Sequence, residues 1–324
     1  MAAITFLLGY VGAQAVEQNS SSANASGSLG NGQSRQMVRL TQRRDGDSIH
    51  FWAENLEAAD VTATFGLSLV NLRGSRGFPL TMTLAPHQRI EAFTLRPIDA
   101  GREWRFNITN AYTLGSSLAV HDDSYAYSLP FAAGQAFQVT QADDGPFSHS
   151  GAERHAIDWK MPEGTPVFAA RSGIVVGTKD DSDTGGPERR FETCANYILI
   201  EHSDGTIANY AHLLKHGVKV RLGEKVDVGT AIGQSGNTGF SSGPHLHLSV
   251  FKTLNGRDRE SIPIRFQTAH GVERLVSGES YAAPVTRLAA RGMGFDAPRT
   301  RKGATVTDGT RLDGKSQELP LVHQ

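Results

Sequence analysis

Two histidines are separated by a single leucine in the segment GPHLHLSV, residues 243–250. Side chains two residues apart on a β-strand lie on the same face, so His245 and His247 are expected to project into one space. Two imidazoles placed in this way can bind a metal ion, transfer a proton or face solvent from an edge strand. The H-x-H spacing alone does not distinguish between these three uses.

Two further residues extend this candidate site, Asp158 between Ile157 and Trp159, and His212 in the segment NYAHLL. A carboxylate with such apolar neighbours must face water, a partner or a metal, because burial without a partner costs several kcal/mol. Catalytic zinc sites use three ligands from His, Asp and Glu and keep a fourth position open for water. One further neutral histidine can take the proton of that water, and another can hydrogen-bond the developing oxyanion. The sequence therefore contains candidates for every role in a zinc hydrolase.

Residues 149–251 resemble the lysostaphin/LytM-type zinc endopeptidases, which cleave peptide cross-links of bacterial peptidoglycan. The matching stretches are AIDWKMPEGTPVFAARSGIVV, NYILIEHSDGTIANYAHL and GEKVDVGTAIGQSGNTGFSSGPHLHLSV. The resemblance implies one zinc ion, bound by Asp158 and His247 together with a first histidine ligand. It also implies that His245 and His212 act on the water and on the transition state. The function that we expect is zinc-dependent cleavage of peptidoglycan cross-links or stem peptides.

The first zinc ligand departs from the pattern of this family, which is H-x-G-x-D with the histidine four residues before the aspartate. Arg154 occupies that position, and its guanidinium has no lone pair to offer a metal. His155 is three residues before Asp158, so on a regular strand it faces the opposite side, unless a bulge changes the phase. His149, in the loop segment FSHSG, needs no strand phase and resembles the ligand of family members with a longer loop. We therefore predict His149 as the ligand, and His155 as a residue of the substrate groove or one that contacts a ligand without binding the metal.

The composition excludes several other kinds of protein. The chain has 324 residues, enough for two domains, and its 32 basic and 33 acidic residues give a net charge of −1. This balance gives no excess of positive charge that would attract nucleic acid or an anionic membrane, so no nucleic-acid partner is expected. The only cysteine, Cys194, excludes an internal disulfide and a cysteine-based zinc cluster.

Short alternating stretches separated by turn residues predict an all-β chain. The first set predicts an accessory β-sandwich that could bind a protein partner, and the second a mainly antiparallel metallopeptidase domain. The expected organisation is a possible signal peptide at 1–15, a flexible linker at 16–36, the β-sandwich at 37–130, the metallopeptidase domain at 131–282 and a polar, disordered tail at 283–324.

The N-terminal residues partly match a secretory signal. Residues 2–12 are apolar but too few to span a bilayer, and Ala13-Gln14-Ala15 resembles a cleavage site, although the positively charged start is missing. We expect an exported protein of the periplasm or cell envelope.

Two alternatives stay open at this point. A catalytically inactive relative could act as a scaffold or activator of another cell-wall hydrolase, although such proteins typically lose zinc ligands. A lipoyl or biotinyl carrier would share the β-architecture and could use Lys160, which precedes Met161. However, a carrier needs its lysine at an exposed hairpin tip and has no use for the histidines. The sequence does not distinguish between a D-alanyl cross-link, a glycine bridge and a non-wall peptide as the bond that is cut.

Overall fold

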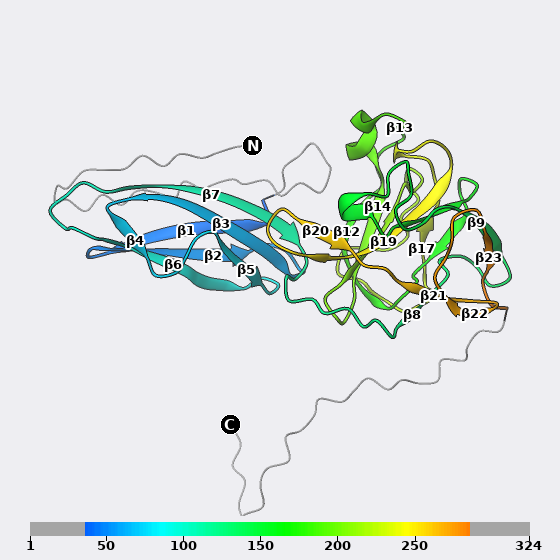
Figure 1. The fold of residues 1–324 in the computed structure, drawn as a ribbon, viewed down its shortest axis with the longest axis horizontal. Coiled ribbons are helices and arrows are strands. Elements are labelled where there is room, and N and C mark those ends of the chain that lie inside the picture. The colour runs from blue at the N-terminus through cyan, green and yellow to red at the C-terminus, as the bar shows by residue number, and fades with distance from the viewer. Residues whose placement is uncertain (1–35, 286–324) are drawn as a thin grey trace, which may run out of the picture. The chain divides into compact units, whose positions relative to one another are not determined.

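A computed structural model describes residues 36–285 of the chain. Strands dominate these residues, and the helices among them are two short 3-10 segments, η1 (Gly151–Glu153) and η2 (Arg189–Cys194) (Figure 1). The prediction of an all-β chain is therefore confirmed. None of the helices within residues 36–285 has the length and apolar character needed to cross a membrane. The predicted signal peptide, most of the linker and most of the tail lie outside the described residues.

Two antiparallel sheets form the N-terminal part. Along strand β2 every second residue is buried, which fits a strand with one face toward a core. The rings of Phe51 and Phe93 stack within one sheet at 4.6 Å, and Phe93 meets Phe65 of the other sheet at 5.9 Å. The sheets thus pack face to face, as the alternating sequence predicts. Their strands are β1 (Val38–Asp45), β2 (Ser48–Asn55), β6 (Arg89–Pro97) and β4 (Leu72–Gly74) in one sheet, and β5 (Leu80–Leu84), β3 (Val61–Val70) and β7 (Arg105–Leu114) in the other.

A nine-stranded sheet forms the centre of the C-terminal part, and all its pairings are antiparallel. Its strands, in spatial order, are β16 (Lys225–Val226), β12 (Gly173–Lys179), β14 (Tyr197–Glu201), β15 (Ile207–Ala211), β19 (His245–Thr253), β10 (Ile157–Lys160), β9 (Ala136–Gln141) and β23 (Ser280–Ala282), with β20 (Arg259–Ser261) paired to β19. Smaller sheets join β11 (Pro166–Phe168) to β17 (Ala231–Gln234), β13 (Gly185–Gly186) to β18 (Gly239–Phe240), and β8 (Ala126–Ser128) and β22 (Gly271–Glu273) to β21 (Arg265–Thr268).

Strand β19 explains why two histidines stand in an apolar segment. Leu246, Leu248 and Val250 point into the main hydrophobic core, where none of them is exposed. The strand alternates, so His245 and His247 lie on its other face. The apolar residues anchor the strand, and the histidines are held at fixed positions on the opposite side of the sheet.

The two parts share a second hydrophobic cluster. Val176, Leu199, Ile207 and Phe251 of the C-terminal part pack with the core residues of the N-terminal sheets. The turn after β19 adds polar contacts, because the amide of Gly256 donates to the Thr64 hydroxyl at 2.9 Å. The domain boundary at residue 130 stays a prediction. The two parts contact each other through buried apolar side chains.

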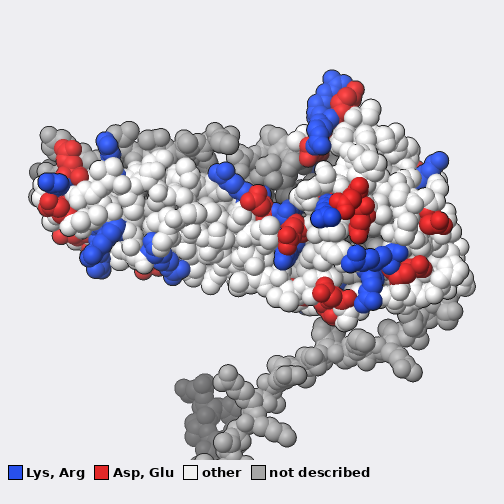
Figure 2. Space-filling model, viewed as in Figure 1, with Lys and Arg blue, Asp and Glu red and all other residues white. Residues whose placement is uncertain are grey.

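Charged side chains of both signs are interspersed over the face of the molecule shown in Figure 2. Several of the basic groups on that face lie beside acidic ones.

Candidate metal centre

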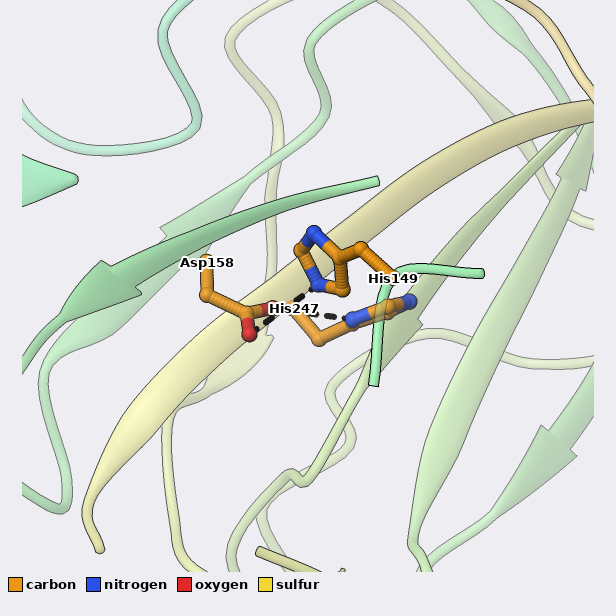
Figure 3. Close-up of side chains that lie close together, drawn as sticks. All are labelled: His149, Asp158 and His247. Atoms are coloured by element: carbon orange, nitrogen blue, oxygen red, sulfur yellow. Dashed lines mark hydrogen bonds and ion pairs between the residues drawn. The ribbon is translucent and has the colours of Figure 1, made fainter. Parts of the chain in front are cut away.

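The three predicted ligands meet in one buried cluster. Ligand atoms of His149, Asp158 and His247 all lie within 4.8 Å of one another. His149 Nε2 is 3.1 Å from one oxygen of the Asp158 carboxylate, and His247 Nδ1 is 2.9 Å from the other oxygen (Figure 3). A tetrahedral zinc ion with bonds of about 2.0–2.1 Å requires ligand atoms about 3.3 Å apart. The donor set and its spacing therefore fit a divalent metal, although their roles as ligands stay a prediction.

Strand pairing brings two of these residues together. Asp158 on β10 is the direct partner of His247 on β19. Residues opposite each other on an antiparallel pair project to the same face. The apolar neighbours of Asp158 point into the core, where Trp159 is completely buried. The aspartate itself therefore points to the face that carries the histidines.

His149 reaches the cluster from the loop that precedes η1. Its side chain is fully buried, and Nδ1 lies 3.0 Å from the carbonyl oxygen of Ala142. A carbonyl only accepts, so Nδ1 donates to it and Nε2 faces Asp158. The buried Nε2 makes no other hydrogen bond within the described residues. A ring nitrogen placed against a carboxylate oxygen in this way fits a cation bound by both groups.

The alternative candidate, His155, lies outside this cluster. Its Nδ1 is 3.1 Å from a carboxylate oxygen of Asp143, and its backbone amide donates to Ser261 Oγ at 2.9 Å. Arg154, at the position of the usual ligand, forms an ion pair with Asp144 at 2.7 Å. The η1 turn lies between the loop histidine and β10, and His155 precedes the first residue of that strand, Ile157.

Gln141 links Asp158 to the loop that carries His149, and the sequence did not indicate this role. It lies on β9 as the strand partner of Asp158, and its Nε2 donates to Asp158 Oδ2 at 2.7 Å. Its Oε1 accepts from the backbone amides of Phe147 and Ser148, at 2.9 and 3.3 Å. A single side chain therefore orients the carboxylate and the loop together.

Glu153 and Arg259 form a second support that sequence reasoning missed. Glu153 Oε2 lies 3.4 Å from His247 Nε2, and Arg259 donates to Glu153 Oε1. Burial acts to raise the pKa of Glu153, but the charge of Arg259 and the contact with His247 lower it to about 2. Burial likewise acts to lower the pKa of His247, and the carboxylates of Asp158 and Glu153 raise it to about 10. A metal ion that binds His247 must therefore displace a proton from its ring.

Asp158 stays ionised in this setting. Burial acts to raise its pKa, but the adjacent rings of His149 and His247 lower it well below the usual value. A permanent negative charge at the centre of the cluster favours a cation there.

The two predicted non-ligand histidines lie beside the three predicted ligands. The ring centroids of His212 and His245 are 4.5 Å apart, and the His212 ring is 5.6 Å from that of His247. His245 Nε2 is 3.8 Å from Asp158 Oδ1. All five candidate residues therefore occupy one cluster, although their catalytic roles stay predictions.

Backbone carbonyls select the tautomer of both non-ligand rings. His212 Nδ1 donates to the Thr238 carbonyl at 2.7 Å, and His245 Nδ1 donates to the Gly243 carbonyl at 2.8 Å. Burial lowers the pKa of His212 to about 3 and also lowers that of His245. Both rings are thus neutral near pH 7, and each presents an Nε2 lone pair that can accept a proton.

His212 faces the site because of an unusual backbone conformation. Ala211 is the strand partner of His247, so a regular strand would turn the next side chain to the opposite face. His212 instead has φ of +62°, in the left-handed region that non-glycine residues rarely adopt. Such conformations cost of order 1–3 kcal/mol and cluster at functional sites. The sequence pattern alone did not reveal this change of direction.

Hollows flank the cluster on two sides. One, of about 450 Å³, is lined by Asp158, His245, Lys160 and residues 242–244. The other, of about 500 Å³, is lined by His212, His247 and part of the 189–195 segment. Lys160 lies in β10 opposite His245 rather than at a hairpin tip, which is not the placement that a carrier lysine needs.

Comparison with known proteins places this site in a family context. Residues 152–260 match the model described as Peptidase family M23, a segment that includes Asp158, His212, His245 and His247 and begins after His149. A protein of Buchnera aphidicola subsp. Baizongia pistaciae named as an uncharacterized metalloprotease is 37% identical over 116 residues, which cover 35% of this chain and 28% of that protein.

Two relatives carry more specific names. The peptidoglycan DD-endopeptidase ShyA of Vibrio cholerae serotype O1 is 33% identical over 129 residues, 40% of this chain and 27% of its own length. Lysostaphin of Staphylococcus simulans is 38% identical over 129 residues, 39% of this chain and 24% of its own length. The chain thus aligns with less than a third of each of these relatives.

Proposed function

We propose that this protein is a zinc-dependent endopeptidase that hydrolyses peptides of bacterial peptidoglycan, because residues 152–260 match the model of peptidase family M23. The observation that supports this best is that a pair of predicted metal ligands and a pair of neutral histidines lie in one cluster. Asp158 and His247 face each other across paired strands, and His212 and His245 stand beside them as neutral proton acceptors. Names of relatives that refer to peptidoglycan support the substrate class.

We assign the metal to His149, Asp158 and His247, which leaves a fourth tetrahedral position for water. Zinc fits best, since two imidazoles and one carboxylate are ligands that it accepts in catalytic sites. The bound ion would make water more acidic and polarise the carbonyl of the peptide.

The neutral histidines would transfer the protons. Since His212 Nδ1 and His245 Nδ1 are bound to carbonyl oxygens, their Nε2 atoms accept a proton from water as it attacks the peptide carbonyl. A ring that has accepted a proton then has an Nε2–H, which can donate to the oxyanion or to the leaving amine. The same two groups can thus act as base, oxyanion donor and acid in turn.

We propose that the peptide lies across the cluster, from one hollow to the other. Such a path would expose the scissile carbonyl to both the ligands and the neutral rings. The substrate class implies that the protein is exported to the periplasm or cell envelope. The N-terminal sheets remain a candidate surface for a protein partner.

Digestion of purified peptidoglycan sacculi tests the function directly. The zinc-loaded protein should release peptide-containing fragments that mass spectrometry identifies, and a chelator should abolish the release. His247→Ala is the matched control, because it removes a proposed ligand and leaves His212 and His245 in place. If the loaded protein releases nothing more than this variant does, the chain is a binding or scaffold protein and the proposal is wrong.

A further inference from the structure

Glu153 lies against the side of the His247 ring that faces away from Asp158. Its Oε2 is 3.4 Å from Nε2, whereas Asp158 Oδ1 is 2.9 Å from Nδ1. An imidazole ligand gives one nitrogen to the metal and needs a hydrogen-bond acceptor for the other. Glu153 supplies this acceptor at the nitrogen that does not face the other ligands.

We propose that Glu153 is a positioning residue that fixes the His247 ring with Nδ1 toward the metal, and that Arg259 holds Glu153 in place. This inference rests on the metal centre of the proposed function and extends it to two residues outside the ligand set. Neither residue touches the metal in this assignment. Both act through His247.

The Glu153 carboxylate has a defined orientation. It belongs to the η1 turn and is 24% exposed, and its second oxygen accepts from Arg259 Nη2. One oxygen therefore binds the arginine while the other faces the histidine. A carboxylate fixed at both oxygens restricts rotation of the ring that it contacts.

Arg259 is itself fixed by its strand and by an aromatic ring. It starts β20 as the partner of Thr253, and its guanidinium lies 4.5 Å from the centroid of the Phe251 ring. The preceding turn contacts the N-terminal sheets, where a side-chain carbon on Gly256 would come within 2.1 Å of the Ala111 carbonyl oxygen. The N-terminal part thus supports the hairpin whose arginine orients Glu153, which gives that part a role in the metal centre.

Zinc affinity measured by competition with a chromophoric chelator tests the proposal. Glu153→Gln should weaken zinc binding about 10- to 100-fold, the range typical when such an outer partner is lost. Arg259→Gln should weaken it in the same direction. If Arg259 acts only through Glu153, the double variant should bind no more weakly than Glu153→Gln alone. The visible spectrum of the cobalt-substituted protein should also change in Glu153→Gln, which a purely structural role would not require.

Glu260→Gln is the matched control, since it breaks an ion pair of 2.8 Å with Lys252 on the same strand pair without a contact to His247. It should bind zinc like the unmodified protein. Unchanged zinc affinity and cobalt spectrum in Glu153→Gln would overturn the proposal. If that variant does not fold, Arg259→Gln decides in the same way, because it leaves the carboxylate in place. An unmodified chain that binds no zinc would instead refute the metal centre as a whole.

Discussion

Removal of the His149 imidazole is the sharpest test of the proposed metal centre, because this proposed ligand departs from the H-x-G-x-D pattern of the family that residues 149–251 resemble. The ring is fully buried and anchored by its bond to the Ala142 carbonyl, so Nε2 is held in one position. Zinc held by four protein ligands corresponds to about 10–16 kcal/mol of apparent binding free energy. An equal share of about 3 kcal/mol for each ligand predicts that His149→Ala binds zinc roughly 10²-fold more weakly.

His155→Ala is the natural comparison, since His155 contacts Asp143 and lies outside the ligand cluster. Its zinc affinity should stay within about twofold of the unmodified protein. Chelator competition measures both variants, and thermal unfolding with and without zinc provides a second readout. At a fixed excess of free zinc, a 10²-fold weaker affinity lowers the zinc-dependent stabilisation by about 2.7 kcal/mol. If His155→Ala empties the site and His149→Ala does not, the assignment of the first ligand is wrong.

Three further predictions concern other parts of the structure. His212→Ala and His245→Ala should each retain zinc. Each should lose about 10²–10³-fold in kcat/KM on a peptide substrate, because each removes a proton acceptor. A zinc-free His245→Ala protein would show that this residue is a ligand instead. Gln141→Leu should lower the free energy of urea unfolding by about 2–3 kcal/mol, since a hydrogen bond to an ionised carboxylate is lost, and an unchanged midpoint would contradict the proposed link to Asp158. Glu201→Gln should stabilise the zinc-free protein more at pH 8 than at pH 5, because burial, with the charge of Asp60, raises the pKa of Glu201 from 4.5 to about 7. Between these pH values the folded state holds a proton that the unfolded state has released, so the stability of the unmodified protein falls as pH rises. The gain in unfolding free energy of Glu201→Gln at pH 8 should be roughly 1–2 kcal/mol after allowance for partial exposure. Equal gains at both pH values would refute this prediction.

Strand periodicity made much of this structure predictable. A period of two places His245 and His247 on one face of their strand. The apolar residues that alternate with them are buried in the core, so the histidine face points away from it. The same reasoning turns Asp158 away from the core that holds Trp159. These features follow from local alternation, which is why the all-β fold and most of the cluster could be derived from the sequence.

The supporting residues could not be derived in this way. Glu153 contacts His247 from a single 3-10 turn, which has no periodic pattern. Gln141 contacts Asp158 through a strand pairing that the sequence does not specify. Arg259 meets Glu153 across a separation of 106 residues in the chain. His212 depends on a positive φ that its sequence neighbours do not demand. Each of these placements is decided by tertiary contacts rather than by local preference.

The histidines of this cluster are divided into two chemical classes by the groups that contact them. His247 lies between two carboxylates, which raise its pKa to about 10 despite burial. His212 meets a carbonyl and two other imidazoles, and burial lowers its pKa to about 3. Environments that push similar groups apart in this way separate their roles. The carboxylates concentrate negative charge where a cation would bind, and the neutral ring beside them keeps a free lone pair for a proton. The same residue type can therefore carry different charges within one site, and the groups in contact with each ring decide which charge it carries.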